Sequence, residues 1–441
     1  MKSPLFRTIL FGSALSLCTQ PLSAQVNVSV NGQYMNRAEY RHGFSTLAAP
    51  EQDAAFFISQ RARVMTSLKF QDAEMYVSIQ DIRTWGSTAN AAIDNAGLLS
   101  VHEAWVALPI NKKFALKMGR QEIAYDEDRI FGSLDWLMQA RRHDAAIIKF
   151  YDSASNTQIH AGLAFNQNQE QLAGTVYTVP NNYKTFQYIY FNRPFGKIKS
   201  SFLFLNNGIQ IQKPNTVPVE YTTVFTQTFG PRLVYKESSN KLSGNVAFYY
   251  QTGTNNLNQS LSGYDLMAEL TYDLSKKFAL TAGLEVISGT DQINAPSGES
   301  KSFTPFYGTN HRFNGYMDYF YVGNHGNSVG LNDYYLKGLM KGSKTLLGAA
   351  VHFFSSNAVV ENDDSPGTSG SSRLGTELDL TIVHKLKPGI SFQGGYSQMF
   401  ATQSMAYLKN VADGHNQTNN WAYVMLILRP GVEWPRTGLK L

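Results

Sequence analysis

Polar and apolar side chains alternate along many short segments of the chain. Between residues 242 and 251, Val246 and Phe248 fall on one side, and Asn245 and Gln251 fall on the other. Segments 278–286 and 374–382 repeat this pattern. A period of two with one apolar side indicates β-strands that have lipid or a packed layer on one face and water or side chains on the other.

Short and long connections alternate between these segments. The short connections lie near residues 71–72, 109–112, 152–156, 194–196, 237–240, 273–275, 341–343 and 386–389. The long connections lie near residues 41–54, 86–98, 124–141, 167–182, 208–222, 254–261, 290–329, 357–371 and 403–418. This order predicts an all-β fold, a transmembrane up-and-down antiparallel β-barrel of about 18 strands with both chain ends on the short-turn side. A secreted β-sandwich or β-propeller is the alternative, with shorter strands and no such asymmetry of turns.

The composition agrees with a membrane barrel. The chain holds 24 Tyr and 27 Phe, and its mean hydropathy is −0.26. Aromatic girdles and alternate polar residues produce this profile in outer-membrane barrels. The longest apolar run past residue 24, residues 421–428, has the length of a strand and not of a transmembrane helix.

The first residues predict a cleaved leader. Lys2 and Arg7 precede an apolar run that ends in Leu22-Ser23-Ala24, so we expect residues 1–24 to be a signal peptide, residues 25–430 the barrel and residues 431–441 a periplasmic tail. The only cysteine, Cys18, lies in the leader, which excludes disulfides from the mature chain. The formal net charge of +5 gives no indication of nucleic-acid binding.

Alternation also assigns charged residues to the inner face of the barrel. The basic candidates are Arg61, Arg63, Lys69, Lys117, Arg232, Lys241, Lys337 and Arg373. The acidic candidates are Glu74, Glu103, Asp265, Glu269, Glu285, Glu377 and Asp379. The predicted wall is therefore mixed in charge, and cross-strand ion pairs with no transport role are an alternative for any single arginine.

One polar stretch carries a family resemblance. It contains Gly119-Arg120-Gln121-Glu122, then Arg129, then Asp135-Trp136, and it closes with Arg141-Arg142-His143-Asp144. Together with Gln60-Arg61-Ala62-Arg63 and the segment 80–86, it resembles the alginate-export (AlgE-like) family of outer-membrane proteins. Segments 310–318, 323–326 and 330–333 are similar to more distant branches of that family.

The resemblance implies an eighteen-strand barrel with an arginine-lined constriction that passes an anionic polysaccharide. The positions that match its arginine motifs are Arg61, Arg63, Arg120, Arg129, Arg141 and Arg142. Arginine suits this task because its planar fork binds a carboxylate with two hydrogen bonds. Arg120 shares its side of the strand with Met118, so it faces lipid unless it lies beyond a bulge or above the bilayer.

The connection 290–329 is the second candidate site. A loop of this length is usually functional. Folded inward, it would narrow the pore with Tyr307, His311, Arg312 and Tyr316; an ordered surface cap is the alternative. The acidic runs 126–128 and 361–364 are interpreted as solvated loops rather than cation sites.

We expect a passive outer-membrane channel of a Gram-negative bacterium for anionic solutes, such as an alginate-like polysaccharide or oligosaccharide, with no catalytic residue, metal or cofactor. The expected partners are outer-membrane lipid, lipopolysaccharide, the barrel assembly machinery and the solute, and the chain is expected to be a monomer. A general diffusion porin of weak selectivity and an occluded surface barrel with an enzymatic or adhesive role are the alternatives.

Overall fold

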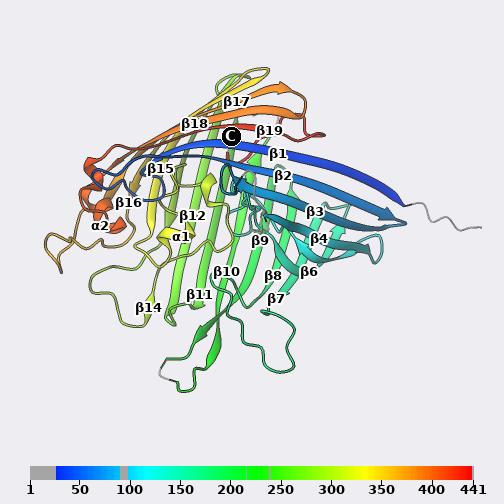
Figure 1. The fold of residues 1–441 in the computed structure, drawn as a ribbon, viewed down its shortest axis with the longest axis horizontal. Helices are drawn as coiled ribbons and strands as arrows, with labels where there is room; N and C mark the ends of the chain where they lie inside the picture. The colour runs from blue at the N-terminus through cyan, green and yellow to red at the C-terminus, as the bar shows by residue number, and fades with distance from the viewer. Residues whose placement is uncertain (1–25, 90–97, 215, 238–239, 440–441) are drawn as a thin grey trace, which may run out of the picture.

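The wall of the molecule is a closed antiparallel barrel. The computed structural model describes residues 26–89, 98–214, 216–237 and 240–439, so the predicted signal peptide lies outside the described residues. Each strand pairs with its neighbours in sequence, and pairing of β1 with β19 closes the barrel (Figure 1). Of the 19 strands in the described sheet, β14 has only 2 residues and joins β12 in parallel, which leaves the predicted eighteen wall strands.

The wall strands other than β5, which has 8 residues, are long enough to cross a bilayer when tilted. Their bounds are β1 Asn27–His42, β2 Ala55–Phe70, β3 Ala73–Thr84, β4 Leu99–Pro109, β5 Phe114–Gln121, β6 His143–Asp152, β7 Thr157–Phe165, β8 Thr185–Phe195, β9 Ile198–Gln212, β10 Tyr221–Lys236, β11 Leu242–Thr254, β12 Ser260–Asp273, β13 Phe278–Ile287, β15 Leu331–Lys341, β16 Thr345–Ser355, β17 Arg373–Lys387, β18 Ile390–Ala401 and β19 Asn419–Leu428, with the short β14 at Glu299–Ser300.

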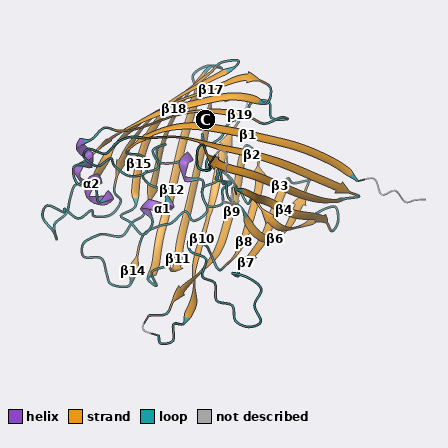
Figure 2. Ribbon diagram, viewed as in Figure 1, coloured by secondary structure: helices purple, strands orange, loops and turns teal. Residues whose placement is uncertain are grey.

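Helices are confined to the connections (Figure 2). They are η1 Asn310–Arg312, α1 Val322–His325, α2 Gln403–Lys409 and η2 Gly414–Asn416. Within the described part of the chain, none of them is long and apolar enough to cross a membrane.

The outer and inner faces of the wall differ as alternation predicts. Val246 and Phe248 are exposed on the outside of β11, whereas Asn245 and Gln251 are buried on its inner side. The same outer band runs through other strands, for example at Ile148, which is 50% exposed. An apolar exterior around a polar interior is the arrangement that a lipid environment requires.

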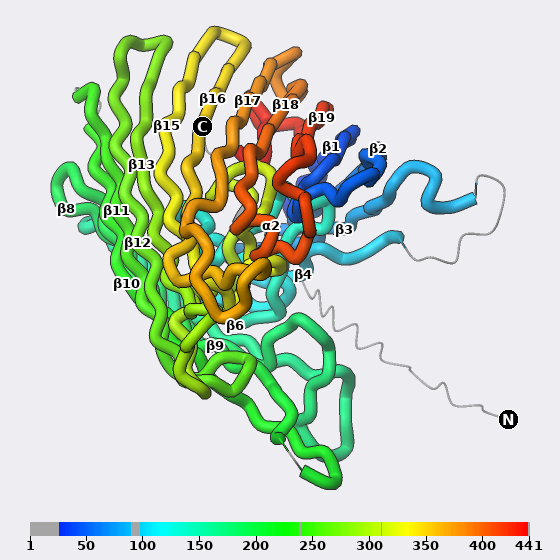
Figure 3. Tube along the Cα trace, turned by 90° about the vertical axis from the view of Figure 1, so that its left-hand side faces the viewer, coloured from blue at the N-terminus to red at the C-terminus, as the bar shows by residue number. Residues whose placement is uncertain are grey.

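The connections follow the predicted order. All eight short turns occur where they were predicted, and the long loops gather at the opposite end of the barrel. Two predicted long loops are shorter than expected: they span only residues 213–220 and 255–259, because the β9–β10 and β11–β12 ladders extend to the ends of their strands. The side view in Figure 3 shows the strands as a curved wall.

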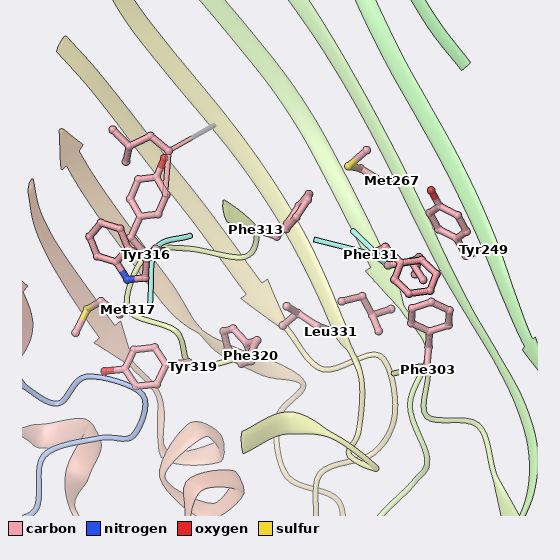
Figure 4. Packing of buried hydrophobic residues seen from close by; sticks show 14 of the residues in the cluster. Phe131, Tyr249, Met267, Phe303, Phe313, Tyr316, Met317, Tyr319, Phe320 and Leu331 are labelled. Carbon is pink, nitrogen blue, oxygen red and sulfur yellow. The ribbon is translucent and has the colours of Figure 1, made fainter. Parts of the chain in front are cut away.

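Two long loops fold into the barrel and pack against the inward-facing side chains of the wall. They are the β5–β6 loop, residues 122–142, and the β13–β15 loop, residues 288–330. The backbone N–H of Met317 donates to Glu377 of β17 at 2.9 Å, and that of Thr304 donates to Gln251 of β11 at 2.8 Å. Figure 4 shows side chains of the β13–β15 loop packed beside the barrel wall. The loop is therefore an internal element and not a surface cap.

The segment after β19 also enters the barrel, which corrects the prediction of a periplasmic tail. The Gln393 side chain of β18, on the inner face of the wall, donates to the Thr437 carbonyl at 2.8 Å, and Leu439 is buried. No pattern in the sequence indicates this inward course, because the side-chain hydrogen bonds that hold the segment come from Ser391, Gln393 and Asp135, which are distant in sequence.

Candidate functional site in the barrel lumen

The β5–β6 loop is anchored across the lumen by Arg129. Its Nε lies 2.9 Å from Asp265 of β12 and 2.8 Å from Glu285 of β13, and its guanidinium lies 4.7 Å from the Phe313 ring. Burial opposes its charge, but the two carboxylates outweigh that effect and raise the pKa of Arg129 above its ordinary value. Arg129 thus holds the loop to β12 and β13, and the two carboxylates compensate its charge.

The acidic turn 126–128 is not solvated, which corrects its interpretation from the sequence. Glu127 pairs with Arg232 of β10 at 2.5 Å, and Asp128 pairs with Arg312 of the β13–β15 loop at 2.7 Å. Burial is the largest influence on Asp126 and raises the pKa of its carboxyl. Arg232 and Arg312 therefore face the lumen as predicted, but each is already neutralised.

Arg61 and Arg63 lie on the inner face of β2 and hold the other end of the same loop. Arg61 is fully buried and donates to Asp135 at 2.6 Å and to the Met138 carbonyl at 3.1 Å. Arg63 donates to Gln80 at 2.7 Å. Burial of Asp135 opposes ionisation, but Arg61 and Arg63 lower the pKa of that carboxyl below its usual range. Both arginines are occupied with the protein's own groups.

A bulge in β4 creates a small cluster near Arg63. The β3–β4 register shifts between Ser78 and Ile79, and the ligand atoms of His102, Glu103 and Glu122 come within 4.8 Å of one another. This donor set has the composition of a metal site. However, Arg63 lies 3.9 Å from Glu122, and His102 bonds to Glu122 at 2.8 Å, so a cation and a hydrogen bond already compensate the cluster.

Arg141 differs from Arg129 and Arg312, which both pair with carboxylates. Its guanidinium donates to the Gly308 carbonyl at 3.1 Å and lies 6.0 Å from the Tyr307 ring. Among the described residues, no carboxylate is within ion-pair distance of it. Burial lowers the pKa of Arg141 to about 10, so the side chain is charged at neutral pH. Arg141 is thus a half-buried cation without an acidic partner in the described structure.

Arg141 lines a cavity of about 440 Å³ at the long-loop end. Its lining includes three arginines, aromatic rings from both inward loops, and one carboxylate, that of Asp318, which bonds to His311 at 2.9 Å. The principal lining residues are Arg41, Phe44, Trp136, Arg141, Arg142, His143, Asn182, Tyr183, Phe306, Tyr307, His311, Asp318 and Tyr321. The outer mouth therefore combines cations with aromatic faces.

A second cavity, of about 360 Å³, lies at the short-turn end on the β10–β17 side. Its lining is mixed in charge and includes Lys236, Lys337, Glu269 and Asp379. Tyr316 of the β13–β15 loop contributes to its lining. The two inward loops lie between the outer and the inner cavity, so together they form the narrow part of the lumen.

The loop aromatics stabilise this narrow part. Tyr307 stacks on Phe131 with ring centroids 5.5 Å apart, and its hydroxyl donates to Asn207 of β9. His311 packs flat against Trp136 at 4.0 Å. Tyr316, labelled in Figure 4, is buried and lies 5.4 Å from His311. These ring contacts hold the two loops together.

Arg120 lies outside the pore, which corrects its assignment from the family motif. It occupies the same side of β5 as Met118, which is 51% exposed, and it pairs at 2.9 Å with Asp144 of β6. Burial lowers the pKa of the neighbouring Arg142 below its ordinary value. Arg142 also lines the outer cavity. Arg83 and Asp81 form a similar pair on β3. These pairs stand at the long-loop ends of their strands, beyond the apolar band.

Arg373 also lies outside the predicted lumen position. The β16–β17 register shifts between Phe354 and Ser355, so Gly375 pairs with Phe354 and Arg373 with Ser355. The shift turns Leu374 inward, where it is fully buried, and leaves Arg373 exposed at the rim. Strict alternation therefore failed here because the bulge inserts one residue.

The inner face of β1 carries charged side chains that were not predicted. Arg37 pairs with Glu39 at 2.7 Å and donates to the Trp136 carbonyl, and Arg41 pairs with the second oxygen of Glu39 at 2.8 Å. The spacing Arg37, Glu39, Arg41 has the strand period of two and could have revealed this face.

A closed barrel with an apolar exterior and a charged lumen defines an outer-membrane channel. The chain belongs to the alginate export family, which matches residues 26–327. No curated protein sequence matches it.

Solved porin structures share the fold. A BenF-like porin from Pseudomonas fluorescens Pf-5 is 12% identical, with a TM-score of 0.59 over 91% of this chain and 99% of that chain. OccK9 (OpdG) of Pseudomonas aeruginosa is 11% identical, with a TM-score of 0.59 over 91% and 98% of the two chains. OpdK of Pseudomonas aeruginosa, solved with vanillate, is 9% identical, with a TM-score of 0.57 over 91% and 98%.

Proposed function

We propose that the protein is a passive channel for anionic solutes in the outer membrane of a Gram-negative bacterium, with alginate-like polysaccharides or oligosaccharides as the solute class. The observation that carries this proposal is Arg141, a cation without an acidic partner in the described structure, in the wall of the outer cavity. Membership of the alginate export family supports it. So does vanillate in the OpdK structure, because vanillate is a carboxylate.

The outer cavity suits a carboxylated sugar. A carboxylate at Arg141 would accept two hydrogen bonds from its planar fork, and Arg41 and Arg142 add positive potential nearby. Tyr183 and Tyr307 offer aromatic faces to a sugar ring. The contacts must also be weak, because a solute that enters the pore has to leave it. The proposed role is transport, with lipid, lipopolysaccharide and the assembly machinery as partners of a monomeric barrel.

Planar-bilayer recordings test the proposal. In the intact protein, oligouronates should block the current at lower concentration than neutral oligosaccharides of equal length. Arg141→Gln should weaken that block by roughly tenfold, since a lost charge-assisted hydrogen bond is worth about 1.5 kcal/mol. Arg373→Gln is the matched control, because it removes the same charge from the exposed rim. Equal block by charged and neutral sugars would reject the anionic solute.

A general diffusion porin of weak selectivity is the second candidate. This alternative is favoured by the buried acids on the inner face of β12, β13, β15 and β17, namely Asp265, Glu285, Asp333, Glu377 and Asp379. In that case both sugars block equally and Arg141→Gln changes nothing. An occluded surface barrel would show no conductance at all.

A further inference from the structure

The segment 434–439 returns from the short-turn end and lies against the inner face of β18. The Ser391 hydroxyl donates to the Pro435 carbonyl. Gln393 binds the backbone of Thr437 twice: its amide group donates to the carbonyl at 2.8 Å, and its oxygen accepts from the N–H at 3.3 Å. β18 pairs with β17 on one side and with β19 on the other, so its backbone groups are used within the wall. The segment is therefore held by side chains of β18.

The far end of this segment reaches the β5–β6 loop. The Thr437 hydroxyl donates to Asp135 at 3.2 Å, and the other oxygen of the same carboxylate pairs with Arg61. Gly438 has φ +72 and approaches Trp136 so closely that a Cβ would lie 2.2 Å from a ring atom. Glycine is therefore needed at 438 for both its backbone conformation and its contact.

The segment and the inner cavity occupy different parts of the lumen. The cavity is lined by β10–β17, whereas the segment contacts β18, Lys385 of β17, which is not in the cavity lining, and, through Asp135, Arg61 of β2. Segment 434–439 therefore lies beside the inner cavity, on the β18 side of the short-turn end. It contacts the β5–β6 loop, which narrows the lumen. A solute that crosses beside Arg61 has to pass the place where this segment lies.

The attachment of the segment is of a kind that water can replace. Ser391 and Gln393 are polar, so hydration can satisfy them when the segment leaves. The apolar contacts are those of Leu439, which is buried, and Trp434, which is partly buried. The indole N–H of Trp434 is buried without an acceptor among the described residues, which disfavours the docked position. The nearest ion pair joins Glu433, the residue before the segment, to Lys385 of β17 at 2.9 Å, and the same lysine lies 5.6 Å over the Trp434 ring; the Glu433 carboxylate is exposed to water.

We propose that segment 434–439 is an inner gate: it closes the Arg61 side of the lumen when docked and leaves the lumen when the channel conducts. This inference rests on the channel fold and is independent of the solute. It assigns the Gln393–Thr437 contact as the latch and the Gly438–Trp136 contact as the point where the gate meets the β5–β6 loop.

Gly438→Val tests the gate without altering the wall. The added side chain collides with Trp136, so the segment should leave its position, and single-channel conductance should rise at least about twofold, because an eighteen-strand barrel encloses an aqueous lumen once its contents move. Gly431→Val is the matched control: its φ of +81 brings similar backbone strain, but its nearest contact is 3.5 Å away. A conductance of Gly438→Val equal to that of the control overturns the proposal.

A reversible lock gives a second measurement on one protein. Gln393→Cys combined with Thr437→Cys loosens the latch, and a short reducible bis-thiol reagent then ties the segment to β18; the only natural cysteine, Cys18, lies in the predicted leader. Bridged channels should stay at low conductance, and reduction should raise it. Equal conductance before and after reduction overturns the gate. Ion selectivity should be unchanged in either state, so failure of the gate and failure of the anion-channel proposal are distinguishable.

Discussion

Trp136 and His311 lie flat against each other, with ring centroids 4.0 Å apart and planes inclined by 7°. Trp136 belongs to the β5–β6 loop and His311 to the β13–β15 loop, so this contact joins two segments that enter the barrel from different strands. The guanidinium carbon of Arg37 of β1 lies over the same indole, 4.0 Å from its ring centroid. Trp136 therefore joins the two inward loops and β1 in the narrow part of the lumen.

Trp136→Ala should loosen both loops at once. Removing a fully buried tryptophan costs about 3–5 kcal/mol, and here the loss falls on loop packing while the wall strands keep their ladders. The expected result is a noisier and larger current with an unchanged β-sheet circular dichroism spectrum. Trp85→Ala, at an indole that is 54% exposed, is the control and should leave the current unchanged.

Asp135→Ala should lower the stability of the folded barrel. Arg61 is fully buried, and the substitution leaves its charge without a carboxylate, which typically costs about 3–5 kcal/mol. The thermal midpoint of unfolding in detergent, followed by circular dichroism, should fall by several degrees. Asp152→Ala removes a carboxylate from the surface pair with Lys113 and should leave the midpoint in place. An unchanged midpoint in Asp135→Ala would show that Arg61 does not depend on this partner.

Docking of α2 should strengthen as the pH rises. Lys409 donates to the carbonyls of Tyr319 and Asn324, and burial lowers its pKa from 10.5 to about 7. Between pH 7 and pH 10.5 the undocked lysine binds more protons than the docked one, so docking gains at most about 1.4 kcal/mol per pH unit and is weakest below pH 7. Hydrogen exchange of α2 amides, corrected for intrinsic rates, measures this gain. Lys409→Met should remove the pH dependence, and a slope that persists in this variant would place the titration elsewhere.

A charged side chain on the apolar outer band should lower the stability of the barrel in lipid. Ile148→Arg places a cation on the face that is 50% exposed in β6, and arginine near the middle of a bilayer costs about 2–4 kcal/mol. Urea unfolding in lipid vesicles should report this loss, whereas Ile148→Leu should be close to neutral. Arg120→Leu, at the loop end of β5, should cost far less than Ile148→Arg, because Arg120 and Asp144 lie beyond the apolar band.

Alternation and turn order were sufficient to predict the barrel, its eighteen wall strands and its outer face. A strand in lipid must place apolar residues at every second position, as at Val246 and Phe248. The strands can therefore be predicted from short stretches of sequence. The same rule assigned Arg61, Arg63 and Arg232 to the inner face. It failed at Arg373, where a register shift changes the side of the strand, and the family motif failed at Arg120, which shares its side with Met118.

The contents of the lumen were decided only by the tertiary structure. Whether Arg129 or Arg141 has an acidic partner depends on Asp265, Glu285 and the path of a loop, and these are brought together across the barrel from positions distant in sequence. Segment 434–439 shows no period that indicates an inward course; its position follows from side-chain hydrogen bonds to Gln393 and Asp135. The wall could be predicted from the sequence because lipid imposes a local pattern of apolar residues, whereas the pore depends on long-range contacts that leave no such pattern.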